Sequence, residues 1–223
     1  MSLIKVFLFD RKDWQSVEGE GGRLLMSENS NRCRDMETET RNIRFFTKVF
    51  TVTQIIGILT IVLLVVWLNL FRGGFAWHSN PKLEFNWHPL FMVLGLVFLY
   101  ANGALVYRAF RGEMKRKLKL IHAGFHLSAL IFTIIGLQAV FDSHNLNVDA
   151  QNNPKPLPNL YSLHSWLGLS VVILFSCQWA MGLITFLAPG FRSAIRSAYL
   201  PLHTFFGIAI FVGAVATSLL GLN

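Results

Sequence analysis

Five long stretches without a charged residue constrain the fold of this chain more than any other feature. No Asp, Glu, Lys or Arg occurs within Val49–Phe71, Pro89–Tyr107, Leu120–Phe141, Pro156–Phe191 or Ser197–Asn223. A helix of about 20 apolar residues crosses the ~30 Å hydrocarbon core of a bilayer, so each stretch predicts one membrane span. The stretches do not alternate apolar with polar residues, which argues against a β-barrel. We therefore expect an all-α membrane protein, a helical bundle with five spans in the lipid bilayer.

The basic residues are distributed so unevenly that they predict how the chain crosses the membrane. Of the 20 Lys and Arg residues, nine precede residue 49 and six lie between Arg108 and Lys119. The positive-inside rule then places the N-terminus in the cytosol and the C-terminus on the other side. The net charge of +8 is accounted for mainly by this topology signal, with anionic lipid or substrate binding added to it. No nucleic-acid partner is expected.

The N-terminal residues differ in composition from the rest of the chain. Residues 1–45 are polar and mixed in charge, which predicts a disordered cytosolic tail, followed by a membrane domain over 46–223. No signal peptide is visible, so we expect the first span to act as the signal anchor. The two cysteines, Cys33 and Cys177, fall in the tail and in a span, so neither a disulfide nor a metal-thiolate site is expected.

Four of the five spans carry a histidine near their first residue. The second and fourth spans start outside, which puts His88 and His164 at the outer level. The third and fifth start inside, which puts His122 and His203 at the cytosolic level. An ionisable side chain within a span is costly and marks a functional site by default. The sequence therefore predicts two histidine pairs, one near each membrane face.

Two histidines at each level favour haem over zinc. Zinc requires three or four ligands, and the spans contain no carboxylate. Haem iron takes two axial ligands, and a bundle core can house the macrocycle. We predict two haem b groups and outer-sphere electron transfer between the faces. His126, about 6 Å deeper than His122, is a rival ligand. His122 is preferred because it matches the depth of His203, leaving His126 beside the haem. A histidine-lined proton or metal-ion transporter without haem is the alternative function.

Polar residues at the two ends of the bundle suggest where the redox partners bind. At the cytosolic end, Arg108, Lys115 and Arg196 are suited to haem propionates and to an anionic electron donor. At the outer end, the electron acceptor is expected at His144, Asn145 and the turn Asn159–Ser162. We expect His78, in the outer loop, to be simply exposed to solvent.

Five short segments around the histidines resemble those of one family. They are F-N-W-H-P at Phe85–Pro89, A-L-V-Y-R at Ala104–Arg108, I-H-A-G at Ile121–Gly124, L-Y-S-L-H-S-W at Leu160–Trp166 and P-L-H-T-F-F-G at Pro201–Gly207. The set resembles the cytochrome b561 family of ascorbate-dependent transmembrane oxidoreductases, over roughly residues 49–222. This resemblance implies the same histidine pairs as axial ligands of two haems. It further implies haem contacts at Arg108, His126, Asn159, Leu160, Tyr161 and Ser162.

The resemblance also implies substrates and a location. Lys115 and Arg196 would hold cytosolic ascorbate, and His144 with Asn145 would receive a ferric chelate or monodehydroascorbate. The expected location is a secretory or endo-lysosomal vesicle membrane or the plasma membrane, and homodimer formation is a further option. Members of the family have six spans, whereas five are visible here, and a truncated variant is the simplest explanation. The tail over residues 1–45 is longer than the family leads us to expect.

Overall fold

The computed structural model describes residues 11–222, with side chains from residue 31 onward. Within this part of the chain the regular structure is helical, apart from one isolated bridge between Val148 and Pro154. Five helices are long and apolar enough to cross a membrane, which confirms the expected all-α membrane fold. They cover Asn31–Leu70, Pro81–Ala109, Lys115–Asn145, Leu163–Leu187 and Ser193–Leu220.

The first helix, α1, runs from Arg11 to Leu70 without a break. The sequence predicted a disordered tail up to residue 45, of which residues 1–10 lie outside the described part of the chain. The helix extends further back because no proline occurs before Pro81 to interrupt it and because many of the charged residues are good helix formers. By its contacts, the chain divides into a unit up to Gln54 and a unit from Ile55 onward.

The second span is built from four consecutive pieces. These are α2 (Pro81–Glu84), α3 (Trp87–Met92), a π-helical stretch η1 (Val93–Leu99) and α4 (Tyr100–Ala109). Asn80 caps α2, because its side-chain oxygen accepts a hydrogen bond from the backbone N–H of Leu83 at 3.3 Å. The buried Asn86 amide donates to the carbonyl oxygens of Arg72 and Gly74, at 3.2 and 2.6 Å. These bonds tie the outer loop to the start of α3.

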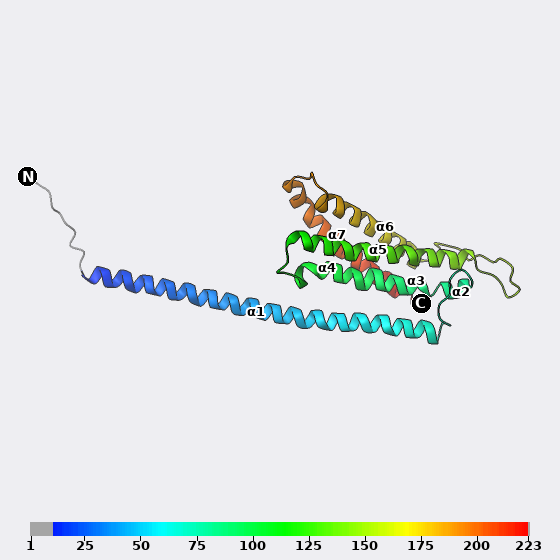
Figure 1. The fold of residues 1–223 in the computed structure, drawn as a ribbon, viewed down its shortest axis with the longest axis horizontal. Coiled ribbons are helices and arrows are strands. Elements are labelled where there is room, and N and C mark those ends of the chain that lie inside the picture. Colours follow the sequence, from blue (N-terminus) through cyan, green and yellow to red (C-terminus); the bar gives the residue numbers. More distant parts are fainter. Residues whose placement is uncertain (1–10, 223) are drawn as a thin grey trace, which may run out of the picture. The chain divides into compact units, whose positions relative to one another are not determined.

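The third span is the single helix α5 (Lys115–Asn145), which contacts α2, α3, η1, α4 and α6 (Figure 1). The fourth span is α6 (Leu163–Gly182) with its π-helical end η2 (Leu183–Leu187), and the fifth is α7 (Ser193–Leu220), which packs on α6. A buried apolar cluster joins these helices. It consists of Leu96, Tyr100, Ala129, Val171, Val172, Phe175, Ile210 and Ala214.

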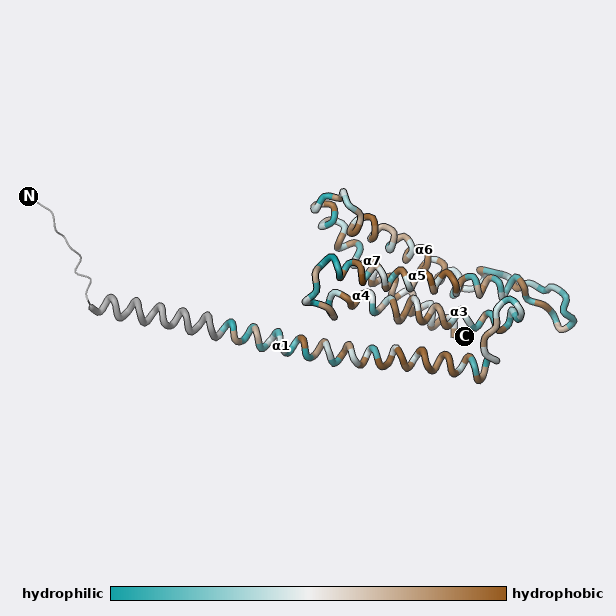
Figure 2. The backbone as a smooth tube through the Cα atoms, in the orientation of Figure 1, coloured by the Kyte–Doolittle hydropathy of each residue, from teal (hydrophilic) through white to brown (hydrophobic). Residues whose placement is uncertain are grey.

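The helices from α3 to α7 are apolar along most of their length, whereas the loop after α5 is mostly polar (Figure 2). Many large apolar side chains point outward, including Ile134, Ile173 and Phe205. Such outward faces suit contact with lipid tails. Inside the bundle small residues allow close helix packing, as at Gly95, where a Cβ would lie only 3.0 Å from the carbonyl oxygen of Ala129.

Candidate functional site

His88 and His164 face each other at one end of the bundle. Their ring centres lie 6.2 Å apart and their planes cross at 83°. The Nδ1 atom of His88 lies 3.1 Å from the carbonyl oxygen of Gly136, and that of His164 lies 2.9 Å from the carbonyl oxygen of Thr217. A carbonyl oxygen only accepts, so each Nδ1 must carry the proton. Each Nε2 therefore keeps its lone pair for a metal ion.

The turn before α6 determines where His164 lies. The Ser162 hydroxyl oxygen accepts from the N–H of Ser165 at 3.2 Å and caps the helix, which puts His164 in its first turn. Leu160 has a φ of +55°, a left-handed conformation that is uncommon for residues other than glycine and often found at functional sites. Tyr161 is exposed. Residues 159–162, which are predicted to contact a haem, lie just before His164 in the chain.

His122 and His203 form a second pair of the same kind. Their ring centres are also 6.2 Å apart, with planes crossing at 65°. The Nδ1 atom of His122 lies 2.8 Å from the carbonyl oxygen of Gly103, so Nε2 is again left for a ligand. The rival His126 is buried, with its ring 4.7 Å from that of Tyr100 and 4.5 Å from that of His122. His126 thus packs into the apolar cluster beside the pair.

The two pairs lie at different levels of the bundle. Gly136, which binds His88, is on α5 fourteen residues after His122. Thr217, which binds His164, is on α7 fourteen residues after His203. At 1.5 Å per residue, fourteen residues of α-helix cover about 21 Å. Both helices therefore give the same separation between the levels, which fits within the ~30 Å core of a bilayer.

The spacing within each pair fits an iron ion held between two imidazoles. A metal–imidazole bond of about 2 Å on each side, with about 1 Å from nitrogen to ring centre, gives about 6 Å between ring centres. Two glycines bring helices close to these rings. A Cβ on Gly182 would lie 2.9 Å from Cε1 of His203, and one on Gly221 would lie 2.8 Å from Cε1 of His164. The residues present therefore fit two bis-histidine haem sites.

The basic residues at the end of the bundle nearer His122 and His203 have different surroundings. Arg196 donates to the carbonyl oxygens of Thr185 and Ala188, at 3.1 and 3.2 Å. Lys119, which the sequence did not single out, donates to the carbonyl oxygen of Phe186 at 3.3 Å. Both side chains therefore stabilise the end of the fourth span. Lys115, the first residue of α5, and Arg108, near the end of α4, are both exposed.

The residues predicted to receive an acceptor are joined by hydrogen bonds at the end of the bundle nearer His88 and His164. The Nδ1 atom of His144 lies 2.9 Å from the side-chain oxygen of Asn159, and the Asn159 amide donates to the side-chain oxygen of Asn145 at 3.0 Å. The N–H of Leu157 also donates to the carbonyl oxygen of His144, at 3.0 Å. These bonds hold the end of α5 against the segment that enters α6, so the three polar side chains share one surface.

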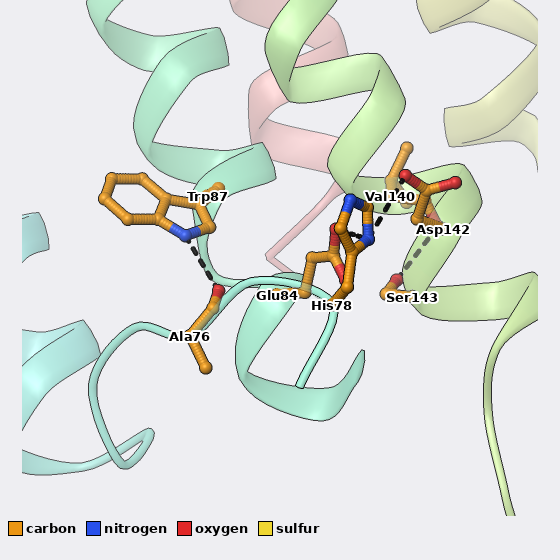
Figure 3. Close-up of polar contacts among 7 residues, drawn as sticks. All are labelled: Ala76, His78, Glu84, Trp87, Val140, Asp142 and Ser143. Atoms are coloured by element: carbon orange, nitrogen blue, oxygen red, sulfur yellow. Dashed lines mark hydrogen bonds and ion pairs between the residues drawn. The ribbon is translucent and has the colours of Figure 1, made fainter. Parts of the chain in front are cut away.

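His78 has partners that the sequence did not predict. Its side chain is 54% exposed, and its Nδ1 atom lies 3.3 Å from Oε1 of Glu84 and 3.9 Å from Oδ2 of Asp142 (Figure 3). Glu84 is fully buried. His78 and Glu84 lie close together in the chain but Asp142 is far from both, so spacing in the sequence carries no signal that the three meet.

Comparisons with known proteins place the chain among its relatives. The family model for eukaryotic cytochrome b561 matches residues 87–223. A Caenorhabditis elegans homolog of the transmembrane ascorbate-dependent reductase CYB561 is 43% identical over 83% of this chain and 70% of its own length. The human transmembrane ascorbate-dependent reductase CYB561 is 46% identical over 77% of this chain, and the human lysosomal membrane ascorbate-dependent ferrireductase CYB561A3 is 43% identical over 75%.

The family match includes all four paired histidines, whereas the alignments do not cover the whole of each relative. The alignments cover 64% of the human CYB561 chain and 66% of the human CYB561A3 chain, slightly less than two thirds in each case. The family match spans more than half of this chain and runs from the start of α3 to residue 223. Together with the identity to the nematode relative, this shows that the chain belongs to the cytochrome b561 family.

Proposed function

We propose that this chain transfers electrons across a membrane, from ascorbate at the cytosolic face to ferric iron or monodehydroascorbate at the opposite face. The observation that carries the proposal is the presence of two histidine pairs, each with ring centres 6.2 Å apart, at two levels of one bundle. The names of the relatives, which describe ascorbate-dependent reductases and a ferrireductase, support the donor and one of the two acceptors.

The side chains that would hold two haem b groups are His88 with His164 and His122 with His203. When bound, haem with both axial positions filled by imidazole supplies a one-electron centre without a site for oxygen. The carbonyl oxygens of Gly136, Thr217 and Gly103 orient three of the imidazoles by accepting from Nδ1. These bonds fix the tautomer and raise the basicity of Nε2, so they strengthen the imidazoles as ligands.

Ascorbate would bind at the cytosolic end beside Lys115 and Arg196, with Arg108 near the haem. Ascorbate is an anion at neutral pH, and cationic side chains bind such oxygens through charge-assisted hydrogen bonds. Arg196 is held by two carbonyl oxygens, which limits how its guanidinium can turn. Lys115 is exposed at the start of α5 and is free to reach the donor.

The acceptor would bind at the surface shared by His144, Asn145 and Asn159. The hydrogen bond between His144 and Asn159 uses Nδ1, so Nε2 of His144 is available to the acceptor. By the distribution of basic residues, this surface faces away from the cytosol and the N-terminus lies inside. The lysosomal relative supports an endo-lysosomal vesicle membrane as the location, with secretory vesicles and the plasma membrane as the other candidates.

The first experiment is a count of haem in the purified full chain. We expect two b-type haems per chain, and one in each of the variants His164→Ala and His203→Ala, because each variant removes one axial ligand from one pair. The control is His78→Ala, a histidine outside both pairs. A chain that binds no haem would contradict the proposal and favour the histidine-lined transporter. The mass of the solubilised protein measures whether the chain forms a homodimer.

A second experiment separates the two acceptors. Vesicles that carry the protein and contain ascorbate are exposed either to a ferric chelate or to monodehydroascorbate generated outside. We expect reduction of at least one acceptor, with a rate that falls to the protein-free level in both histidine variants. Reduction of neither acceptor, with two haems present and reduced, would rule out transfer to the outer face.

A further inference from the structure

A cluster of three metal-ligating side chains lies outside both histidine pairs. His78 comes from the loop after α1, Glu84 is the last residue of α2, and Asp142 lies in the last turn of α5 (Figure 3). One ligand atom from each residue lies within 4.8 Å of the other two. We call these three residues the outer cluster. It meets at the same end of the bundle as His88, which follows Glu84 by four residues.

In the outer cluster, the positive charge that one imidazole can carry is smaller than the negative charge that two carboxylates, one of them the buried Glu84, can carry. Its side chain is 0% exposed, and among the described residues neither carboxylate oxygen has a hydrogen-bond partner. A buried carboxylate that forms no hydrogen bond is costly, by several kcal/mol, unless an opposite charge compensates it or it takes up a proton. His78 supplies at most one positive charge, and it also faces Asp142 at 3.9 Å. One imidazole cannot neutralise two carboxylates.

We propose that the outer cluster binds a divalent first-row transition-metal ion, such as Zn²⁺ or Fe²⁺. One imidazole nitrogen with two carboxylate oxygens suits these ions, whereas Ca²⁺ and Mg²⁺ prefer oxygen ligands alone. With bonds of about 2.1 Å, two ligands of one ion lie at most about 4.2 Å apart. The two distances from His78, 3.3 and 3.9 Å, already meet this limit. The third distance, between the carboxylate oxygens of Glu84 and Asp142, is within 4.8 Å. Rotation of the partly exposed Asp142 side chain can bring it within the same limit.

The site is open on one side. Three protein ligands leave a coordination position for water or for an incoming ligand, as in catalytic zinc sites. The half-exposed side chain of His78 provides a route from solvent. Asp142 is also two residues before His144, so the ion would lie near the proposed acceptor surface. Ion binding at the cluster does not require that surface to function, nor does it require haem.

Without a metal ion, the same contacts would have only a structural role. A protonated His78 would hold the loop against α2 and α5, and its charge would be shared by the two carboxylates. This arrangement binds no metal, so direct binding measurements distinguish the two. The purified haem-containing protein is treated with a chelator, dialysed and titrated with ZnCl₂ in a calorimeter. We expect one Zn²⁺ per chain at the cluster.

Variants assign the binding to the three residues. We expect His78→Ala, Asp142→Asn and Glu84→Gln each to weaken Zn²⁺ binding by about tenfold or more, since each removes a ligand. The matched control is Asp149→Asn, in the same outer region. The backbone N–H groups of Asn153 and Gln151 lower the pKa of Asp149, so its carboxylate is ionised but lies outside the cluster. Its removal should leave binding unchanged.

If Glu84→Gln folds poorly, the variants of His78 and Asp142 still test the proposal, because neither side chain is buried. His78 and Asp142 are 54% and 29% exposed, so their variants should keep the haem spectrum of the unmodified protein. Absence of Zn²⁺ binding by the unmodified protein would overturn the proposal. Equal Zn²⁺ binding by the unmodified protein and by His78→Ala and Asp142→Asn would also overturn the proposal. The outer cluster would then have only a structural role.

Discussion

Gly182 and Gly221 each face an imidazole at a distance that leaves no room for a methyl group. A Cβ would lie 2.9 Å from His203 in the first case and 2.8 Å from His164 in the second. Carbon atoms in contact prefer about 3.5 to 4.0 Å, so an alanine would push the ring away or separate the helices. Each glycine therefore determines how closely the neighbouring helix can approach one histidine pair, although its side chain cannot bind a metal ion.

We expect Gly182→Ala to disturb the site of His122 and His203, and Gly221→Ala to disturb the site of His88 and His164. Each variant should lose one haem of two or shift the midpoint potential of one centre, which a redox titration of the b-type absorption measures. The control is Gly124→Ala, where no heavy atom lies within 4 Å of the new Cβ. Unchanged potentials in both test variants would show that the helices adjust freely.

His144 is held by Asn159 through one ring nitrogen and is available through the other. If it contacts the acceptor, His144→Ala should slow reduction of a ferric chelate severalfold and leave reduction of the haems by ascorbate unchanged. Stopped-flow absorption measures the two steps separately. Asn147→Ala is the control, since Asn147 binds the carbonyl oxygen of Lys155 in the same loop without touching His144 through its side chain. Identical rates in both variants would remove His144 from the acceptor surface.

At the end of the fourth span, Arg196 stabilises a helix end and is also proposed to bind the electron donor. Arg196 on α7 donates to two carbonyl oxygens, of Thr185 in η2 and of Ala188 just after it. Hydrogen bonds from a charged group contribute about 1.5 to 3 kcal/mol each. Lys115 on α5 has no such structural duty in the described contacts. Slower haem reduction by ascorbate in an Arg196 variant would therefore have two causes, the lost contact with the donor and the lost stabilisation of the fourth span, which must be separated.

Lys115→Ala should slow reduction by ascorbate severalfold without lowering the melting temperature, because only the donor loses a contact. Arg196→Ala should both slow reduction and lower the melting temperature. In both variants dithionite should still reduce the haems fully. Lys117→Ala is the control, since Lys117 forms only an exposed ion pair with Glu113, worth at most about 1 kcal/mol. Wild-type ascorbate kinetics in Lys115→Ala would exclude this lysine from the donor site.

The sequence predicts some of these features better than others, for physical reasons. The five spans follow from uncharged runs, because lipid excludes charge from each helix separately. The levels of the histidines follow from the alternating direction of successive spans. The carbonyl partners of His88 and His164 do not follow, since every residue carries a carbonyl group and only packing selects one. The contact of His78 and Glu84 with Asp142 likewise depends on how the segment around α2 folds against the distant end of α5.

At the scale of the whole molecule, the orientation in the membrane is still a prediction from the basic residues. Cys33 provides a direct test, because it is exposed on α1. A maleimide that cannot cross membranes should label Cys33 in inside-out vesicles and not in intact cells. Cys177 lies within the fourth span, where such a reagent does not reach. The variant Cys33→Ser should abolish the signal. Labelling of Cys33 in intact cells would show that the orientation is opposite to the predicted one.

The pair His88 and His164 is bound to the two helices that carry the other pair, so α5 and α7 set the distance between the two pairs. His122 and the carbonyl group of Gly136 sit on one helix, and His203 and that of Thr217 on another. One residue inserted between these marks would rotate the far end by about 100° and advance it by about 1.5 Å. Insertions in the connecting loops would leave the distance between the two levels along α5 and α7 unchanged. The number of residues between these marks on α5 and α7 is therefore expected to stay fixed.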